Sequence, residues 1–148
     1  MHIQSKAMIL ALLLGMAGVL KRAPLSAAPR NTEPGLPVVV LPAAADSATP
    51  LVVFISGDGG WKDFDPRLAA QFVAHRCPVV ALNALHYFWS KKTPEQTTVA
   101  VTGLAERYMK AWGKHDFILA GFSFGADVMP FVVNRLPAAL QAKCRGVA

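Results

Sequence analysis

The sequence lacks several features that would place it in other classes of protein. It has only two cysteines, too few for the disulfide framework of a small secreted domain. It has no internal repeat and no low-complexity segment. Basic residues outnumber acids by 15 to 9, but three of them and no acid fall in the first 28 residues, which leaves 12 against 9, or +3. Because no basic stripe interleaved with aromatic residues is present, we expect no nucleic-acid partner.

No apolar run has the length of a typical membrane-spanning helix. The run at residues 7–20 falls short of the roughly 20 residues that a spanning helix needs. Lys6 precedes this run, and Ser26–Ala28 supply small residues for a cleavage site, as in secretory signal peptides. We therefore predict a signal peptide at residues 1–28. Two basic residues directly after the apolar run leave an uncleaved N-terminal anchor and a cytosolic chain as alternatives.

The two cysteines, Cys77 and Cys144, allow two interpretations. In an exported protein they could pair as a disulfide. We favour two buried free thiols, because cysteine is often interior and two cysteines form no framework pattern.

The chain after the leader alternates apolar runs with helical patterns. Residues 29–36 hold two prolines and a glycine and are predicted to be a linker. Short apolar runs bounded by turn residues predict strands, the first of them an edge strand that Pro42 ends; they lie at 37–41, 51–55, 78–82 and 116–120. This alternation predicts an α/β fold, a parallel sheet with helices on both faces.

Helical patterns separate these runs. Apolar residues recur at helical spacing over 64–76, and further helices are predicted from Phe124 to Arg135 and from Pro137. Thr93 and Gln96 form a capping box around Pro94, and the helix that they begin carries a buried stripe, namely Val101, Leu104, Tyr108 and Trp112.

The strongest chemical motif is Gly121–Gly125, which has the pattern GxSxG. It follows a predicted strand and precedes a predicted helix, the context in which this motif forms a nucleophile elbow. Ser123 is therefore the candidate nucleophile, and the backbone N–H of Phe124 is a candidate oxyanion donor. An ordinary strand–helix turn with a chance serine is the alternative.

A glycine-rich loop, Ser56–Trp61, follows an earlier strand and can bring further backbone amides to the same place. It matches neither the Walker phosphate loop nor the GxGxxG pattern. We expect Asp58 and Gly59 to lie on the oxyanion side of the site, with a plain turn as the alternative.

The residues that activate a catalytic serine are missing downstream of Ser123. In this class an acid and then a histidine follow the serine. Asp127 is the only acid after Ser123, and all four histidines precede it, at positions 2, 75, 86 and 115. We expect Asp127 to brace the elbow or its neighbours rather than to orient a base. We predict that residues 37–148 are the N-terminal part of a longer, C-terminally truncated hydrolase domain, which without a base has little activity.

Four blocks of the sequence closely resemble the VirJ/AcvB family of bacterial virulence-associated proteins: ISGDGGW (55–61), YFWSKKTPEQT (87–97), GFSFGADVMPF (121–131) and NRLP (134–137). The resemblance covers about residues 37–148. It implies an α/β-hydrolase fold in the periplasm, without cofactor or metal. It also implies a serine esterase acting on lysyl-phosphatidylglycerol at the outer face of the inner membrane, or, alternatively, a non-catalytic protein that assists type IV secretion components.

Carried over by motif, the resemblance makes Ser123 the nucleophile and places Asp58 and Gly59 in the oxyanion-side loop. Candidate substrate-binding residues are Asp58, Trp61, Tyr87 and Trp89. Asp58 either binds the ammonium of a lysyl headgroup or bonds its own loop as an Asx turn. The aromatic segment 86–89 either lines the substrate pocket or is a packed loop, and Lys91 and Lys92 either touch anionic lipid or are simply solvated.

Overall fold

The computed structural model describes residues 35–44 and 46–148, so the predicted leader and most of the predicted linker lie outside the described residues. In chain order the elements are β1 (Val38–Leu41), β2 (Leu51–Ile55), α1 (Phe64–Ala74), β3 (Val79–Leu82), α2 (Ala84–Tyr87), α3 (Pro94–Trp112), β4 (Phe117–Gly121), α4 (Phe124–Val133), α5 (Ala138–Gln141) and β5 (Cys144–Val147).

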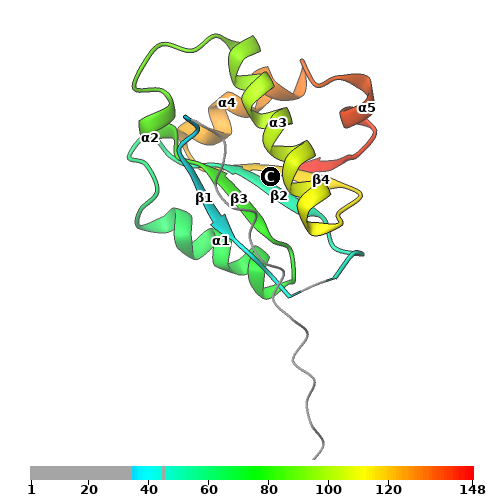
Figure 1. Ribbon diagram of the computed structural model, residues 1–148. Helices are drawn as coiled ribbons and strands as arrows, with labels where there is room; N and C mark the ends of the chain where they lie inside the picture. The colour runs from blue at the N-terminus through cyan, green and yellow to red at the C-terminus, as the bar shows by residue number, and fades with distance from the viewer. Residues whose placement is uncertain (1–34, 45) are drawn as a thin grey trace, which may run out of the picture.

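The strands form one sheet in the order β1-β3-β2-β4-β5 (Figure 1). The strands β3, β2, β4 and β5 are parallel, whereas β1 pairs antiparallel with β3. Among its described residues, the connection from β1 to β2 at 42–50 holds no helix. A parallel crossover needs a longer connection, so β1 runs opposite to β2. The predicted parallel sheet is thus corrected to a mixed sheet, with β1 at its edge as predicted.

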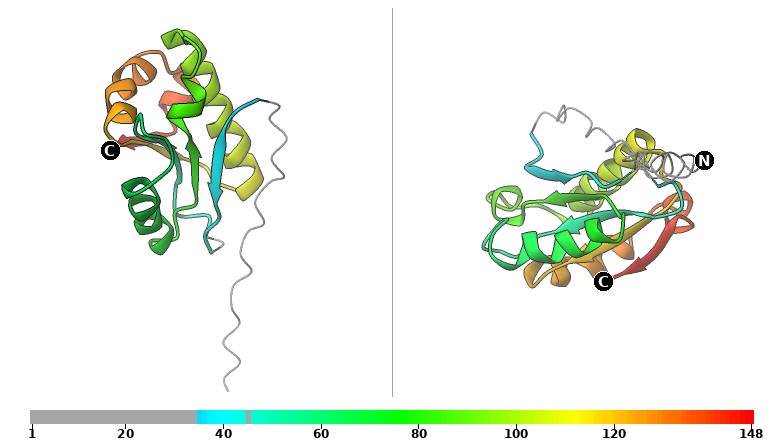
Figure 2. Two further views of the ribbon diagram at one scale, coloured as in Figure 1. Left: turned by 90° about the vertical axis from the view of Figure 1, so that its left-hand side faces the viewer. Right: turned by 90° about the horizontal axis from the view of Figure 1, so that it is seen from below.

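Helices cover both faces of this sheet, which confirms the predicted α/β fold. On one face α1 packs over the smaller apolar cluster. On the other face α3, α4 and α5 pack over the larger cluster. Figure 2 shows α1 and α3 on opposite sides of the strands. The central strands β2 and β3 are buried along their whole length because both of their faces are covered.

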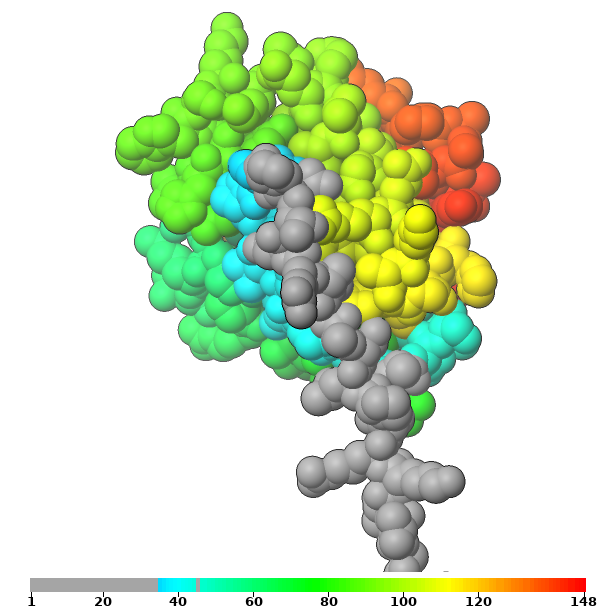
Figure 3. Space-filling view, viewed as in Figure 1, coloured from blue at the N-terminus to red at the C-terminus, as the bar shows by residue number. Residues whose placement is uncertain are grey.

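The helix α3 begins at the predicted capping box. The Thr93 hydroxyl accepts the Gln96 N–H at 3.2 Å, and the Gln96 side chain accepts the Thr93 N–H at 2.9 Å. The predicted apolar stripe is buried against the sheet. Figure 3 shows α3 across the middle of this face, with the green segment before it projecting from the rest of the surface.

That projecting segment contains α2, a short helix that we did not predict. Asn83 caps it by accepting the His86 N–H at 3.3 Å. The segment was predicted only as a loop or pocket wall, because four residues are too few for a helical period to be visible in the sequence.

Cys77 and Cys144 are free thiols, as favoured from the sequence. Each is partly buried, Cys77 with the α1 cluster and Cys144 with the α3 cluster. Burial raises the pKa of the Cys77 thiol, and the nearby Lys114 charge opposes this rise. Among the helices of the described residues, none has both the length and the apolar character needed to cross a bilayer.

The register brings the loop ends together. Ile55, at the end of β2, pairs with Leu82 of β3 and with Gly121 of β4. These three strands therefore end level with one another, and the loops that follow them meet at one edge of the sheet. We call this the carboxyl edge, and the opposite edge, where the parallel strands begin, the amino edge.

Candidate active site

Ser123 lies at the carboxyl edge, between β4 and α4. Its backbone has φ 51° and ψ −122°, a conformation that residues other than glycine rarely adopt. Such strain persists only where the surroundings impose it, and it clusters at functional sites. The Ser123 side chain is exposed, so its hydroxyl is open to a substrate.

The two motif glycines are required by close packing. A Cβ at Gly121 would lie 2.6 Å from the carbonyl carbon of Gly125. A Cβ at Gly125 would lie 2.1 Å from the carbonyl oxygen of Ile55 in β2. No side chain fits at such distances from backbone atoms. The GxSxG spacing therefore lets the elbow turn sharply while α4 stays close to the sheet.

The start of α4 offers one open backbone donor beside the serine. The Gly125 N–H donates to the Phe122 carbonyl at 2.9 Å, and the Ala126 N–H donates to the Ser123 carbonyl at 2.8 Å. Within the described residues the Phe124 N–H meets no acceptor, as suits an oxyanion donor. The N-terminal end of the α4 dipole also favours negative charge here.

The loop after β2 touches the elbow. A Cβ placed on Gly57 would lie 3.7 Å from the Ser123 Cβ, so this backbone passes directly beside the nucleophile. The Gly57 N–H is taken by the Asp65 carboxylate at 3.1 Å. The Gly59 N–H is taken by the Asp58 carboxylate at 3.0 Å, and the Gly60 N–H by the Gly57 carbonyl at 3.0 Å.

These bonds indicate which loop amide can serve as a second oxyanion donor. Among the described residues, the N–H groups of Asp58 and Trp61 are those in the loop without an acceptor. Asp58 directly follows Gly57, which contacts Ser123. The Asp58 N–H is therefore the candidate for the second donor. Gly59 lies in the predicted loop, but its own N–H is occupied.

A cleft of about 350 Å³ opens beside these donors. It is lined by Asp58, Ala84, Leu85, Phe88, Trp89 and Phe124. Apart from Asp58 these residues are apolar, and α2 supplies one wall. Trp89 is 84% exposed at the rim. The cleft thus joins both candidate oxyanion residues to two of the predicted substrate-binding residues, Asp58 and Trp89.

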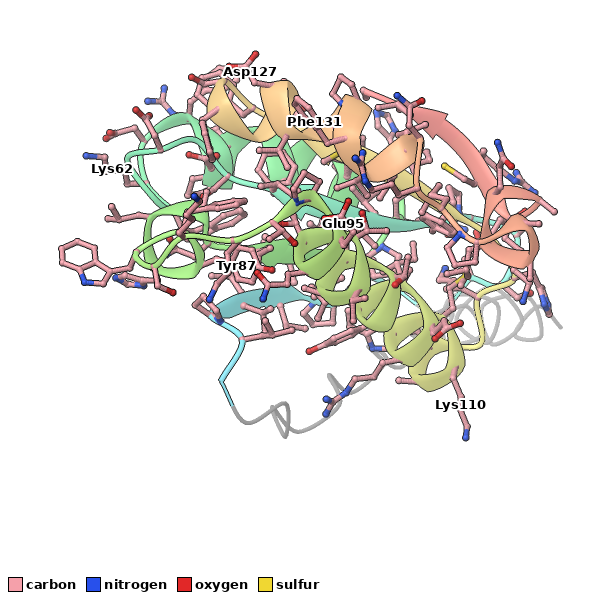
Figure 4. The ribbon with its side chains drawn as sticks, turned by 90° about the horizontal axis from the view of Figure 1, so that it is seen from above. Lys62, Tyr87, Glu95, Lys110, Asp127 and Phe131 are labelled. Atoms are coloured by element: carbon pink, nitrogen blue, oxygen red, sulfur yellow. The ribbon has the colours of Figure 1, made fainter. Side chains whose placement is uncertain are left out.

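The other two predicted substrate-binding residues do not line this cleft. Trp61 packs edge-on against Phe54, with ring centroids 5.9 Å apart, on the α1 side of the sheet. Tyr87 is only 6% exposed and packs edge-on against Phe88, with centroids 4.8 Å apart. It lies between α2 and α3 (Figure 4) and faces a separate groove of about 440 Å³ that Lys92 also lines. Each ring thus has an aromatic partner within the fold, and substrate binding by either residue stays a prediction.

The described histidines do not approach the serine as a base would. His75 and His115 directly precede β3 and β4, so they lie at the amino edge. His86 lies at the carboxyl edge but is exposed on α2 and does not line the cleft.

Asp127 does not brace the elbow as expected. Its side chain is exposed at the outer surface of α4 (Figure 4), and it makes no side-chain bond within the described residues. Among the described residues, no group of three His, Cys, Asp or Glu side chains lies close enough together to hold a metal ion.

Two polar residues at the site were not predicted from the sequence. Ser56 is fully buried; its hydroxyl donates to the Gly57 carbonyl at 3.1 Å and accepts the Ala84 N–H at 2.9 Å. Asp65 is 3% exposed and binds Gly57. Neither residue belongs to a motif with a distinctive spacing. An acid in the first turn of a helix, such as Asp65, is commonplace.

A strained, exposed serine between a parallel strand and a helix, with open amides beside it, defines a nucleophile elbow of the α/β-hydrolase class. Comparison with known families gives a narrower assignment. Residues 49–148 match the family described as bacterial virulence protein (VirJ). The chain belongs to this family, as its motifs predicted.

One solved structure supports the same fold. The chain is similar to brefeldin A esterase, a bacterial homologue of human hormone-sensitive lipase, with a TM-score of 0.54 and 13% identity. The alignment covers 85% of this chain and 42% of that one. A siderophore hydrolase, EstB from Aspergillus fumigatus, aligns with a TM-score of 0.46 and 15% identity, over 78% of this chain and 42% of its own length. No curated protein matches significantly.

Proposed function

We propose that this chain carries the nucleophile of a serine esterase that hydrolyses aminoacylated phospholipid, with lysyl-phosphatidylglycerol as the substrate. The observation that carries the proposal is Ser123 itself, which is strained, exposed and placed beside two open backbone amides. A carboxylic ester is the bond that a serine acyl-transfer site cleaves.

The proposed reaction follows from this arrangement. The Ser123 Oγ attacks the carbonyl carbon of the lysyl ester, and the N–H groups of Phe124 and Asp58 stabilise the oxyanion that forms. The phosphatidylglycerol alcohol leaves with a proton, and water then releases lysine from the acylated serine. The proposal requires a proton acceptor for Ser123, and the described residues place none beside it. We propose that a histidine and its acid partner outside the described residues complete the site.

The cleft suits the two ends of this substrate. Asp58 is the charged residue in its lining, and only one of its carboxylate oxygens is used by the Gly59 N–H. The remaining oxygen can accept the lysyl ammonium. Leu85, Phe88 and Trp89 offer apolar contacts. Lys91 is exposed next to Trp89, where it can meet anionic headgroups at a gain of about 1 kcal/mol.

This substrate lies at the outer face of the inner membrane. We therefore propose a periplasmic location, reached through the predicted signal peptide. Type IV secretion components are the proposed protein partners.

A second candidate function is a non-catalytic binding protein that assists type IV secretion on a hydrolase scaffold. The lack of a histidine beside Ser123 among the described residues favours it. On this alternative Ser123→Ala leaves secretion and the capture of secretion components intact.

The test is release of lysine from vesicles containing lysyl-phosphatidylglycerol, using the protein expressed from its complete gene. We expect Ser123→Ala to abolish release, since losing a triad member costs on the order of 10⁶ in turnover in one protease. Asp127→Asn is the matched control and should leave release unchanged, because Asp127 is exposed and makes no side-chain bond among the described residues. Undiminished release by Ser123→Ala would refute the proposal.

A second arm tests the headgroup. Asp58→Asn keeps the backbone N–H and the side-chain oxygen that binds Gly59, but removes the charge. We expect it to raise KM for the lysyl lipid while leaving hydrolysis of a neutral ester, p-nitrophenyl butyrate, unchanged. Equal losses on both substrates would contradict ammonium binding by Asp58.

A further inference from the structure

Two buried polar residues hold the backbone on either side of Gly57, next to the candidate second oxyanion donor. The Gly57 carbonyl and the Asp58 N–H belong to one planar peptide unit, so the direction of one sets the direction of the other. The Gly57 carbonyl accepts two hydrogen bonds, from the Ser56 hydroxyl at 3.1 Å and from the Gly60 N–H at 3.0 Å. The Asp58 N–H therefore points away from these two donors.

Asp65 fixes the peptide group on the other side of Gly57. Its carboxylate accepts the Gly57 N–H at 3.1 Å across the whole loop, from the first turn of α1. Asp65 is 3% exposed, and a buried carboxylate is rare unless it is partnered. Within the described residues it makes no ion pair. Its recorded hydrogen-bond partner is thus the Gly57 N–H, and its place in the first turn of α1 puts it near the positive end of that helix.

Ser56 ties the same loop to the wall of the cleft. Its hydroxyl oxygen accepts the Ala84 N–H at 2.9 Å, and Ala84 begins α2 and lines the cleft. Glycine next to the nucleophile would otherwise leave this backbone free to rotate, since Gly57 has no side chain to hold it. Ser56 and Asp65 are both buried, and neither lines the cleft.

We propose that Asp65 and Ser56 are positioning residues that fix the two peptide groups on either side of Gly57, Asp65 the Ser56–Gly57 peptide and Ser56 the Gly57–Asp58 peptide, and so aim the Asp58 N–H at the oxyanion. The inference rests on the proposed esterase function and adds to it the groups that preorganise the donor. Preorganised donors stabilise charge without reorganising during the reaction, and removal of one such donor costs about 10²–10³ in kcat.

The first arm of the test measures geometry without catalysis, by amide hydrogen exchange resolved by NMR. In the wild type we expect the Gly57 amide to be protected. Asp65→Ala should accelerate its exchange at least about tenfold, while amides of β2 and β4 keep their protection. Asp65→Asn retains a side-chain oxygen of the same shape and should keep most of the protection. A Gly57 amide that exchanges freely in the wild type would overturn the proposal.

The second arm measures kcat per titrated active site, with p-nitrophenyl butyrate and the protein from its complete gene. We expect Asp65→Ala and Ser56→Ala each to lower kcat about 10- to 100-fold with little change in KM, because a donor aimed at the oxyanion acts in the transition state. Asp65→Asn should recover most of the loss. A purely structural role would lower the number of active sites and leave kcat per site unchanged, which would refute the proposal.

The arms separate the two claims. If Ser123→Ala retains hydrolysis, the proposed function fails, and the exchange arm still decides whether Asp65 holds Gly57. If Ser123→Ala is inactive while Asp65→Ala loses Gly57 protection and keeps kcat, the positioning role is refuted and the proposed function stands. Should Asp65→Ala not fold, the Ser56→Ala and Asp65→Asn variants decide the same question.

Discussion

The two edges of the sheet use polar groups in opposite ways. At the amino edge Lys114, 7% exposed, donates to the Thr49 hydroxyl at 2.9 Å and to the Asp46 carbonyl. Thr49 donates in turn to the Arg76 carbonyl at 2.7 Å, and Arg76 pairs with Asp46 at 3.7 Å. These groups satisfy one another and tie three loops together.

The carboxyl edge leaves groups open instead. Ser123 is exposed in a strained conformation, and the N–H groups of Phe124 and Asp58 find no acceptor among the described residues. The buried polar residues at this edge, Ser56 and Asp65, hold the loop that presents the Asp58 N–H. Polar groups that bond one another, as at the amino edge, hold the fold together. Unbonded amides and a strained backbone beside a cleft, as at the carboxyl edge, indicate a candidate active site.

The largest stability effect expected at the carboxyl edge comes from Gly125→Ala. The added Cβ would lie 2.1 Å from the Ile55 carbonyl oxygen, a backbone atom that cannot rotate away. Overpacking usually costs about 1–3 kcal/mol, and we expect at least the upper value here. Urea denaturation measures the change in the free energy of unfolding.

Gly103→Ala is the matched control. Gly103 lies in α3 with open space around its Cβ position, so we expect a gain of about 0.5–1 kcal/mol from helix propensity. A Gly125→Ala protein as stable as the wild type would show that the elbow is not as tightly packed as described.

A smaller effect on stability is expected from the backbone strain at Ser123, which can be measured apart from the loss of its hydroxyl. Ser123→Gly relieves the positive φ, whereas Ser123→Ala removes the same hydroxyl and keeps the strain. We expect the glycine variant to be more stable than the alanine variant by about 1 kcal/mol, after the greater freedom of glycine in the unfolded chain is allowed for. Equal stabilities in chemical denaturation would mean that the elbow stores no strain.

The smallest effect concerns pH at the amino edge. Burial lowers the pKa of Lys114 below its ordinary 10.5, and the Asp46 charge only partly offsets this. The folded state therefore binds this proton less well than the unfolded state. The cost of burying the charged Lys114 side chain is fully present below the pKa of Lys114 in the folded state. This cost disappears as pH rises toward 10.5, the ordinary pKa of lysine.

We therefore compare the free energy of unfolding of the protein that keeps Lys114 with that of the Lys114→Met variant. The first should increase relative to the second as pH rises toward 10.5. Both proteins should carry Cys77→Ala, because the Cys77 thiol has a raised pKa and interacts with Lys114. Equilibrium unfolding across this pH range measures the difference. A difference that shrinks with rising pH would contradict the assigned burial of Lys114.

Local patterns predicted much of this molecule. The run Leu51–Ile55 matches β2, the box at Thr93 starts α3, and GxSxG falls at the elbow. Each of these depends on neighbouring residues, through burial, capping or a sharp turn. The position of the family motifs was sufficient to predict the hydrolase fold.

What the sequence did not predict depends on contacts across the fold. The pairing of β1 with β3, rather than with β2, which follows it in the chain, depends on the sheet as a whole. The places of Trp61 and Tyr87 follow from which face of the sheet each ring meets. The bond from Asp65 to Gly57 exists only once the loop has closed. No local period or spacing encodes such contacts.

The central claim is that Ser123 is an activated nucleophile. Labelling with a serine-directed fluorophosphonate, followed by peptide mass spectrometry, tests it most directly. The account predicts one adduct, on the peptide containing Ser123, and none in Ser123→Ala. A fully folded protein that takes up no label, or takes it up on another residue, would contradict it.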